Sequence, residues 1–183
     1  MNRNMVALAV ALAVVACNGK PARRHSGEVA VRWSGSDTGS LAGPATAEWC
    51  PALRFLEIRG ITGDTGFAIA LYPSDTVTAG HYRVMDPARA DSSRPAVAVA
   101  LRWVAQTSIK GFQGESGSVD LQRLPSGELS GQLAAAVRSV ADTQRLTIDG
   151  SFQDLPIRPS ARGCAGPDKQ SPADAQPPDT QLH

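Results

Sequence analysis

Apolar and polar side chains alternate along much of the chain between residues 27 and 155. Because successive side chains of a β-strand point to opposite faces, this period of two predicts strands. The positions that share an apolar face are Val29, Val31 and Trp33, then Phe67, Ile69 and Leu71, then Val97, Val99, Leu101 and Trp103, then Val119 and Leu121, and last Leu146, Ile148, Gly150 and Phe152. We expect them to form the core, while Trp49 fits either the core or the surface.

The stretch around residues 96–103 has only small side chains on its second face. Ala96, Ala98 and Ala100 alternate there with larger apolar residues. This pattern indicates a central strand that is closely packed on both sides.

Glycine and proline mark tight turns between the predicted strands. Gly63 and Gly66 flank Asp64 between two apolar stretches, and Pro125-Ser126-Gly127 marks a second turn; both are typical of hairpins. Residues 132–142 are rich in alanine and fit either a helix or a strand. The hairpin turn and Gly131 just upstream favour a strand, which is our prediction.

Short strands joined by turns predict an all-β domain, either an antiparallel β-sandwich or a lipocalin-like β-barrel. Aromatic residues make up only 5% of the chain, and several strands are apolar on both faces. Both features favour a packed sandwich over a hollow barrel. The sandwich is therefore the prediction and the barrel the alternative.

The N-terminus has the features of an export signal. Arg3 precedes an unbroken apolar run at residues 5–16, and Cys17 directly follows Ala16. As a helix this run would span about 18 Å, less than the ~30 Å of a bilayer core, which argues against a membrane-spanning helix. One interpretation is a plain secretory signal in which the cysteine is incidental; the other gives the cysteine a role.

The end of this run resembles the lipobox of bacterial lipoproteins. The resemblance implies a signal peptide over residues 1–16, cleavage before Cys17, and attachment of lipid, with fatty acyl chains such as palmitate, to Cys17. Such an anchor would hold the protein in the cell envelope. Asn18, in place of an aspartate, resembles the sorting signal of enterobacterial lipoproteins, and this resemblance implies the outer membrane.

Composition divides the remaining chain into three parts. Residues 17–26 are polar and basic and form an expected tether, residues 27–164 the β domain, and residues 165–183, with four prolines, an expected disordered tail. The chain has 18 basic and 17 acidic residues, and removal of Arg3 leaves 17 of each. A neutral body gives no electrostatic reason to expect nucleic acid as a partner.

Two cysteines remain once Cys17 is assigned to lipid. In an exported protein the even pair Cys50 and Cys164 indicates a disulfide. Two cysteine ligands of a zinc ion are the alternative, although no histidine or third cysteine lies near either in sequence.

Residues 114–152 resemble β-sandwich segments of uncharacterised bacterial envelope lipoproteins. The shared order is a Gly-x-Val strand, a glycine turn, a Leu-x-Gly-x-Leu strand and a closing Gly-x-Phe strand. The resemblance rests on structural residues and implies no activity.

Asp-Thr-Gly, a sequence found in aspartic peptidases, occurs at residues 37–39 and 64–66. Those enzymes place two such carboxylates around one proton. Here Gly63 precedes Asp64 and Phe67 follows Gly66, which departs from the peptidase pattern, and the two copies are too close for separate lobes. We expect ordinary turns, with the Asp64 carboxylate capping amides of its own turn.

Other catalytic chemistry has little support in the sequence. His81 is the one histidine of the predicted domain, and no Gly-x-Ser-x-Gly elbow accompanies it. We predict no catalytic residues, no metal and no cofactor. The expected function is a non-catalytic binding or scaffolding module at the envelope, with the membrane and an envelope protein as partners. The alternatives are a lipocalin-like carrier of an apolar small molecule and, remotely, a homodimeric aspartic peptidase.

Overall fold

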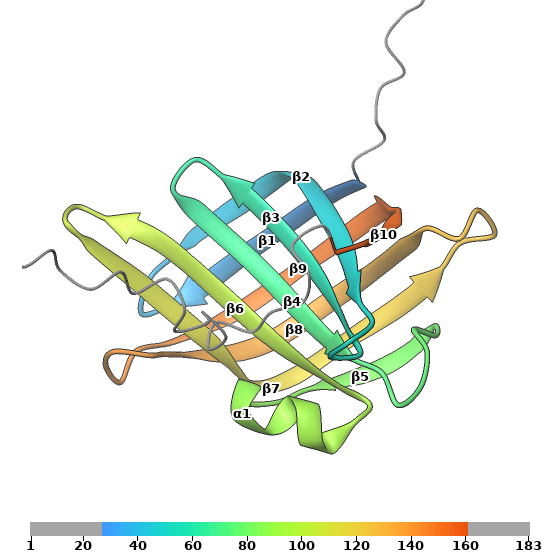
Figure 1. The fold of residues 1–183 in the computed structure, drawn as a ribbon. Helices are drawn as coiled ribbons and strands as arrows, with labels where there is room; N and C mark the ends of the chain where they lie inside the picture. Colours follow the sequence, from blue (N-terminus) through green and yellow to red (C-terminus); the bar gives the residue numbers. More distant parts are fainter. Residues whose placement is uncertain (1–26, 161–183) are drawn as a thin grey trace, which may run out of the picture.

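The strands of residues 27–160, the part of the chain that the computed structural model describes, form one sheet that closes on itself (Figure 1). The predicted signal peptide, Cys17, the tether, Cys164 and the tail lie outside these residues. The elements in chain order are β1 (Gly27–Gly35), β2 (Gly39–Cys50), β3 (Phe55–Thr62), β4 (Thr65–Tyr72), β5 (Gly80–Val84), α1 (Pro87–Ala90), the 3-10 turn η1 (Asp91–Ser93), β6 (Ala96–Ala105), β7 (Ser108–Arg123), β8 (Leu129–Ser139), β9 (Arg145–Leu155) and β10 (Ile157–Pro159).

β1 closes the ring because it pairs along both of its edges. On one side it runs antiparallel to β2, from Gly27 opposite Ala45 to Trp33 opposite Gly39. On the other side it runs antiparallel to β9, where Trp33 lies opposite Ile148. The ring therefore reads β1-β9-β8-β7-β5-β6-β4-β3-β2 and returns to β1, which makes nine strands.

The all-β prediction is confirmed, but the sandwich is wrong and the barrel alternative fits. A sandwich consists of two packed sheets with free edges, whereas here β1 joins what would be the two sheets. The alternation of apolar residues suits both architectures equally, because each has one buried and one outer face.

The barrel has two ends. We call the end with the turns β1–β2, β3–β4, β6–β7 and β8–β9 the tip end. We call the opposite end, where β1 begins and β9 finishes, the terminus end. β5 enters the ring at the terminus end, where it pairs parallel with β6 and antiparallel with β7. β10 runs parallel to β2 at the same end.

The interior is filled by apolar side chains. One continuous cluster takes residues from all nine ring strands. The largest side chains that are almost completely buried are Phe67, Phe152, Leu56, Ile58, Ile69, Leu71, Leu101, Leu129, Ile148, Leu155, Val29 and Val97. Trp33 is 8% exposed, and Trp49 and Trp103 are partly buried against the cluster. The predicted core positions on β1, β4 and β6 are confirmed.

Trp33, Trp103 and Phe112 stack near the tip end of the interior. Ring centroids lie 5.4 Å apart for Trp33 and Trp103 and 5.1 Å apart for Trp103 and Phe112. These offsets are in the range in which aromatic pairs add to the free energy of burial. The stack joins β1 directly to β6 and β7 across the barrel.

Two finer predictions from the sequence are also confirmed. Residues 132–139 belong to β8, with Leu133, Ala135 and Val137 buried, and only residues 140–142 fall in the following turn. The alanine face of β6 is covered in part, since Ala96 and Ala98 pack against Ala90 of α1 whereas Ala100 is exposed. Among residues 27–160, no helix is both long and apolar enough to cross a membrane.

Glycine at position 60 permits the close packing of the interior. Gly60 faces inward on β3, and a methyl group there would overlap the Cγ1 atom of Val29 on β1. Since β2 lies between these two strands, this contact exists only because the sheet curves strongly.

We predict that Gly60→Ala lowers the free energy of unfolding by about 1–3 kcal/mol, the usual effect of overpacking a core. Val29→Ala removes the overlapping atoms, so the double variant should lose less free energy of unfolding than the sum of the two single losses. Urea unfolding measures this coupling. Gly66→Ala on the outer face is the matched control and should change stability by less than about 0.5 kcal/mol. Additive effects at positions 29 and 60 would show that the two residues do not touch.

Candidate functional site

The outer face of the barrel carries a trough over β3, β4, β6 and β7. Its floor consists of Gly66 and Ala68 on β4, Ala100 on β6 and Gly111 on β7, all at outward positions. These residues line up across the strands, since Gly66 lies opposite Arg102, Ala68 opposite Ala100, and Arg102 opposite Gly111. Apart from Arg102, the floor has no large side chains, so a ligand can approach the backbone of the sheet closely.

Larger side chains form the walls of the trough. On the β3 side stand Glu57, Arg59 and Ile61, and on the other side Gln113, Val140 and Pro87 of α1. The volume of this open trough is about 480 Å³. Ile61 is 54% exposed and Val140 is 64% exposed, so two apolar side chains stand in solvent at its tip end.

Arg102 is the cation of the floor. It lies between two glycines on neighbouring strands, Gly66 and Gly111. A methyl group at Gly66 would be 3.4 Å from Arg102 Nε, so the arginine side chain lies over that glycine. Within residues 27–160 no carboxylate pairs with Arg102. Its guanidinium group is therefore available to an anionic ligand in the trough.

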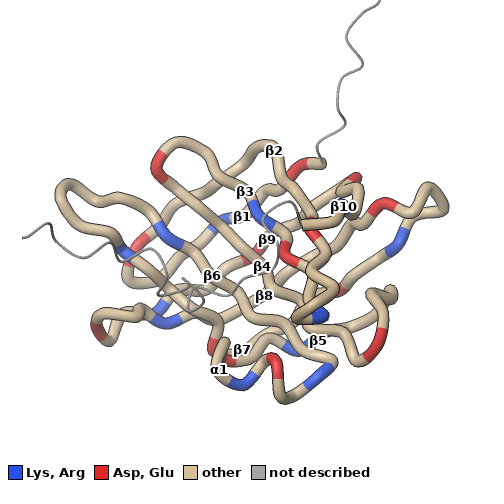
Figure 2. The backbone as a smooth tube through the Cα atoms, in the orientation of Figure 1, with Lys and Arg blue, Asp and Glu red and all other residues tan. Residues whose placement is uncertain are grey.

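The other charges around the trough are paired. Arg59 lies 3.6 Å from Glu57 and 3.8 Å from Glu48. On the opposite side, Arg138 donates to Asp86 at 2.7 Å. Basic and acidic residues are interspersed over the whole described chain (Figure 2). The site therefore offers one unpaired cation within a balanced surface.

Asp86 fixes α1 at the side of the trough. Its carboxylate accepts hydrogen bonds from Arg138 on β8 and, as the N-cap of α1, from the Ala88 amide at 3.0 Å. The Arg138 and Ala88 hydrogen bonds hold the pKa of the Asp86 carboxyl below its usual range. Gln113 Nε2 lies 3.4 Å from the same carboxylate.

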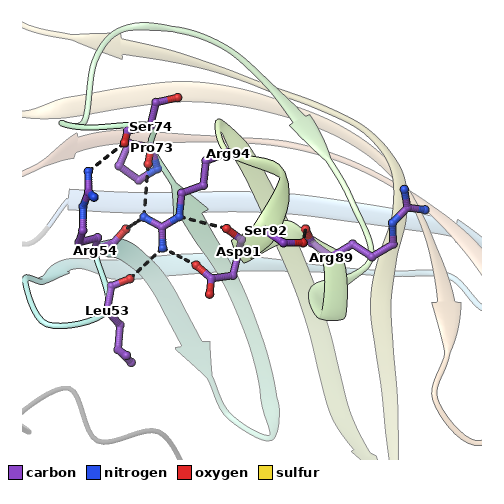
Figure 3. Close-up of polar contacts among 8 residues, drawn as sticks. All are labelled: Leu53, Arg54, Pro73, Ser74, Arg89, Asp91, Ser92 and Arg94. Carbon is purple, nitrogen blue, oxygen red and sulfur yellow. Dashed lines mark hydrogen bonds and ion pairs between the residues drawn. The ribbon is translucent and has the colours of Figure 1, made fainter.

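Arg94 connects α1 and η1 to the terminus end of the barrel (Figure 3). Its guanidinium group donates to the carbonyl oxygens of Leu53 and Arg54 in the β2–β3 turn and of Pro73 after β4. It also pairs with the Asp91 carboxylate and lies 5.6 Å from the Tyr72 ring centroid. Because its donors are used in this way, Arg94 has a structural role. It holds α1, which borders the trough at Pro87, in place.

The two Asp-Thr-Gly turns lie at the tip end and differ from each other. Asp37 accepts a hydrogen bond from the Thr38 amide at 2.7 Å and lies 3.1 Å from Lys110 Nζ. Lys110 and the Thr38 amide hold the pKa of the Asp37 carboxyl below its usual range. The Asp64 carboxylate is exposed and has no partner among the described residues. Its backbone carbonyl instead accepts from the Val104 amide at 3.3 Å.

The expectation for Asp64 is therefore wrong in one respect: it is Asp37 whose carboxylate caps its own turn. The residue with positive φ at the second turn is Gly63, at 56°, and not Gly66. Gly66 instead has extended backbone, because it already belongs to β4 and pairs with Ile61.

The remaining candidates from the sequence lie apart from the trough. His81 Nδ1 is 2.8 Å from Asp120 Oδ1, with both side chains largely exposed, and no hydroxyl group within residues 27–160 bonds to the histidine. Cys50 is buried at the end of β2, while Cys164 lies outside the described residues, so their bridge stays a prediction. Within the described part of the chain, no group of three or more His, Cys, Asp or Glu side chains is placed to hold a metal ion.

Sequence reasoning missed the trough because its parts are far apart in the chain. The alanines of β6 were visible, but only the register of β3, β4, β6 and β7 places Arg102 between Gly66 and Gly111. Comparison with known proteins adds no further residue: no family model, no curated protein and no solved structure matches the chain.

The contrast between the two turns predicts a pH-dependent difference in stability. Because the pKa of Asp37 is lower in the folded state, its ionised form stabilises the fold above the unfolded value near pH ~4. That stabilisation is lost as the pH falls through the folded-state pKa. We expect Asp37→Asn to lower Tm near neutral pH, and the difference from wild type to vanish in strongly acidic solution. Asp64→Asn should leave Tm nearly unchanged at neutral and at acidic pH. An equal loss of Tm in the two variants would show that Asp37 does not stabilise its turn more than Asp64 does.

Proposed function

We propose that this protein is a lipid-anchored, non-catalytic binding module of a bacterial cell envelope, and that the trough is its binding surface. The predicted signal peptide over residues 1–16, followed directly by Cys17, supports the anchor. The chain enters the barrel at Gly27, at the terminus end, so the tether meets the domain there. The trough lies on the side wall, where such a tether leaves it open to a second protein.

The observation that carries this proposal is the unpaired Arg102 over a floor of glycine and alanine. A guanidinium group binds carboxylates with directed hydrogen bonds. The floor admits a backbone, and the exposed Ile61 and Val140 offer contact to apolar side chains. A segment of an envelope protein that combines a carboxylate with apolar residues fits these three features.

The packed interior supports binding at the outer surface and argues against a carrier that holds its ligand inside the barrel. A lipocalin-like carrier needs room inside the barrel, and lipocalin-type barrels can provide it. In this barrel Phe67, Phe152 and Leu101 are among the side chains that fill the inside. An apolar ligand could enter only by displacing them, which would cost the free energy of their packing.

The peptidase alternative has a direct test. An aspartic dyad across a two-fold axis would need the carboxylate of Asp64 from each copy. Hydrolysis of a peptide at acidic pH by wild type, lost in Asp64→Asn with folding intact, would establish it in place of the binding module.

The anchor is tested by Cys17→Ala. Without the thiol that receives the lipid, the protein should appear as a soluble or uncleaved species instead of a membrane-associated one. Fractionation of cells with alkaline and high-salt washing measures this. If the variant stays with the membranes after both washes, lipid at Cys17 is not what holds the protein.

The binding surface is tested by photo-crosslinking in the bacterium. A photoreactive amino acid at Ala100, in the floor of the trough, should link to a second protein. The same amino acid at Ala134, which is exposed on β8 outside the trough, should not. Adding Arg102→Gln should reduce the yield from position 100 about tenfold, since a charge-assisted hydrogen bond contributes about 1.5–3 kcal/mol. Equal yields at positions 100 and 134, or no effect of Arg102→Gln, would refute the trough as the binding surface.

A further inference from the structure

We propose that residues 165–183 of the same chain occupy the trough and compete there with the ligand of the proposed function. The competitive role, though not the occupancy, rests on that proposed function. A partner of the trough then gains access by displacing this segment. The position, length and charge of the segment support this occupant.

The end of the described chain lies beside β2. The Ser160 amide donates to the Trp49 carbonyl oxygen at 2.9 Å, and Ser160 Oγ lies 3.4 Å from Glu48 Oε2. Cys164 follows four residues later in the sequence. Since Ser160 is next to the end of β2, the predicted bridge from Cys164 to Cys50 requires only a short connection.

Cys50 is on the outer face of the sheet, the same face as the trough. It lies opposite Phe55 on β3, and Phe55 shares its face with Glu57, Arg59 and Ile61, because Leu56, Ile58 and Gly60 point inward. Cys50 is nevertheless only 2% exposed. A chain bridged to Cys50 therefore starts on the outer face, in line with the β3 wall of the trough.

The length of the segment matches the distance to Arg102. Cys50 on β2 lies opposite Phe55, and from Phe55 to Ile61 the strand advances by about 20 Å. Arg102 on β6 lies three strand spacings from β2, about 14 Å across. The straight path from Cys50 to Arg102 is therefore about 25 Å. At ~3.3 Å per residue, Asp168 reaches only about 13 Å from Cys164, whereas Asp174 reaches about 33 Å. Asp174 is thus the first carboxylate of the segment that can meet Arg102.

Charge and composition agree with this placement. Residues 165–183 contain Asp168, Asp174 and Asp179 against Lys169 alone, a net charge of −2 with His183 neutral. Four prolines favour an extended polyproline II conformation, and most of the other side chains are small. Such a strip fits a shallow trough whose floor is glycine and alanine and whose unpaired charge is positive.

The test is photo-crosslinking of the purified, full-length lipoprotein in detergent, with the photoreactive amino acid at Ala100 or, as control, at Ala134. We expect position 100 to link to a peptide from residues 165–183 within one molecule, and position 134 not to. Asp174→Asn should lower the yield about two- to fivefold, the range of an exposed ion pair, while Asp168→Asn should leave it unchanged. Peptide mapping without reduction, in the same sample, reports the Cys50–Cys164 bridge.

The outcomes separate this inference from the proposed function. If position 100 yields no intramolecular product, or yields it equally in Asp174→Asn, residues 165–183 do not occupy the trough in the way proposed. Purified protein contains no partner, so this result does not depend on one. In cells, a stop codon after Cys164 should raise the yield of the intermolecular product from position 100. If the intramolecular product forms but no intermolecular one appears in cells, occupancy stands, and the competitive role fails with the proposed function.

Discussion

The structure depends on the pairing of β1 along both of its edges. Because β1 joins β2 to β9, the inner faces of all the ring strands enclose one space of fixed volume. Every inward side chain must then fit its neighbours, and large residues are matched by glycines. Gly60 leaves room for Val29, and Gly131 leaves room for the ring of Phe152. Closure therefore determines where glycine is required as much as where leucine and phenylalanine are buried.

A filled interior moves any binding surface to the outside. The outer face of β4 and β6 is unusual in that its side chains are small, and α1 covers only its terminus end, over Ala96 and Ala98. The part that α1 leaves open becomes the trough, with Arg102 on its floor. Arg94 and Asp86 keep the short helix in place from two sides, so their contacts set where the trough ends toward the terminus end of the barrel.

The sequence predicts the strands well and their assembly poorly, for a physical reason. Alternation identifies which face of a strand is buried, and this is correct for β1, β4, β6, β7 and β9. It carries no information about which strands pair over long distances, and the pairing of β1 with both β2 and β9 decides between barrel and sandwich. The Asp-Thr-Gly copies show the same limit. Their backbones turn as expected, but only the fold places Lys110 beside Asp37 and leaves Asp64 in solvent.

An occupant attached to the same chain needs only weak contacts to fill the trough. A segment held near its site by a short connection has an effective concentration of the order of millimolar. An intrinsic binding free energy of about −4 kcal/mol, equivalent to a Kd of about 1 mM, is then enough for half occupancy. A separate partner must bind more tightly than this, or displace the segment while its own concentration at the membrane surface is high. Anchoring through Cys17 would provide that second condition, because it confines the barrel and other envelope proteins to the same layer. The trough and the anchor would then act together, with the segment excluding weak ligands and the membrane favouring the intended one.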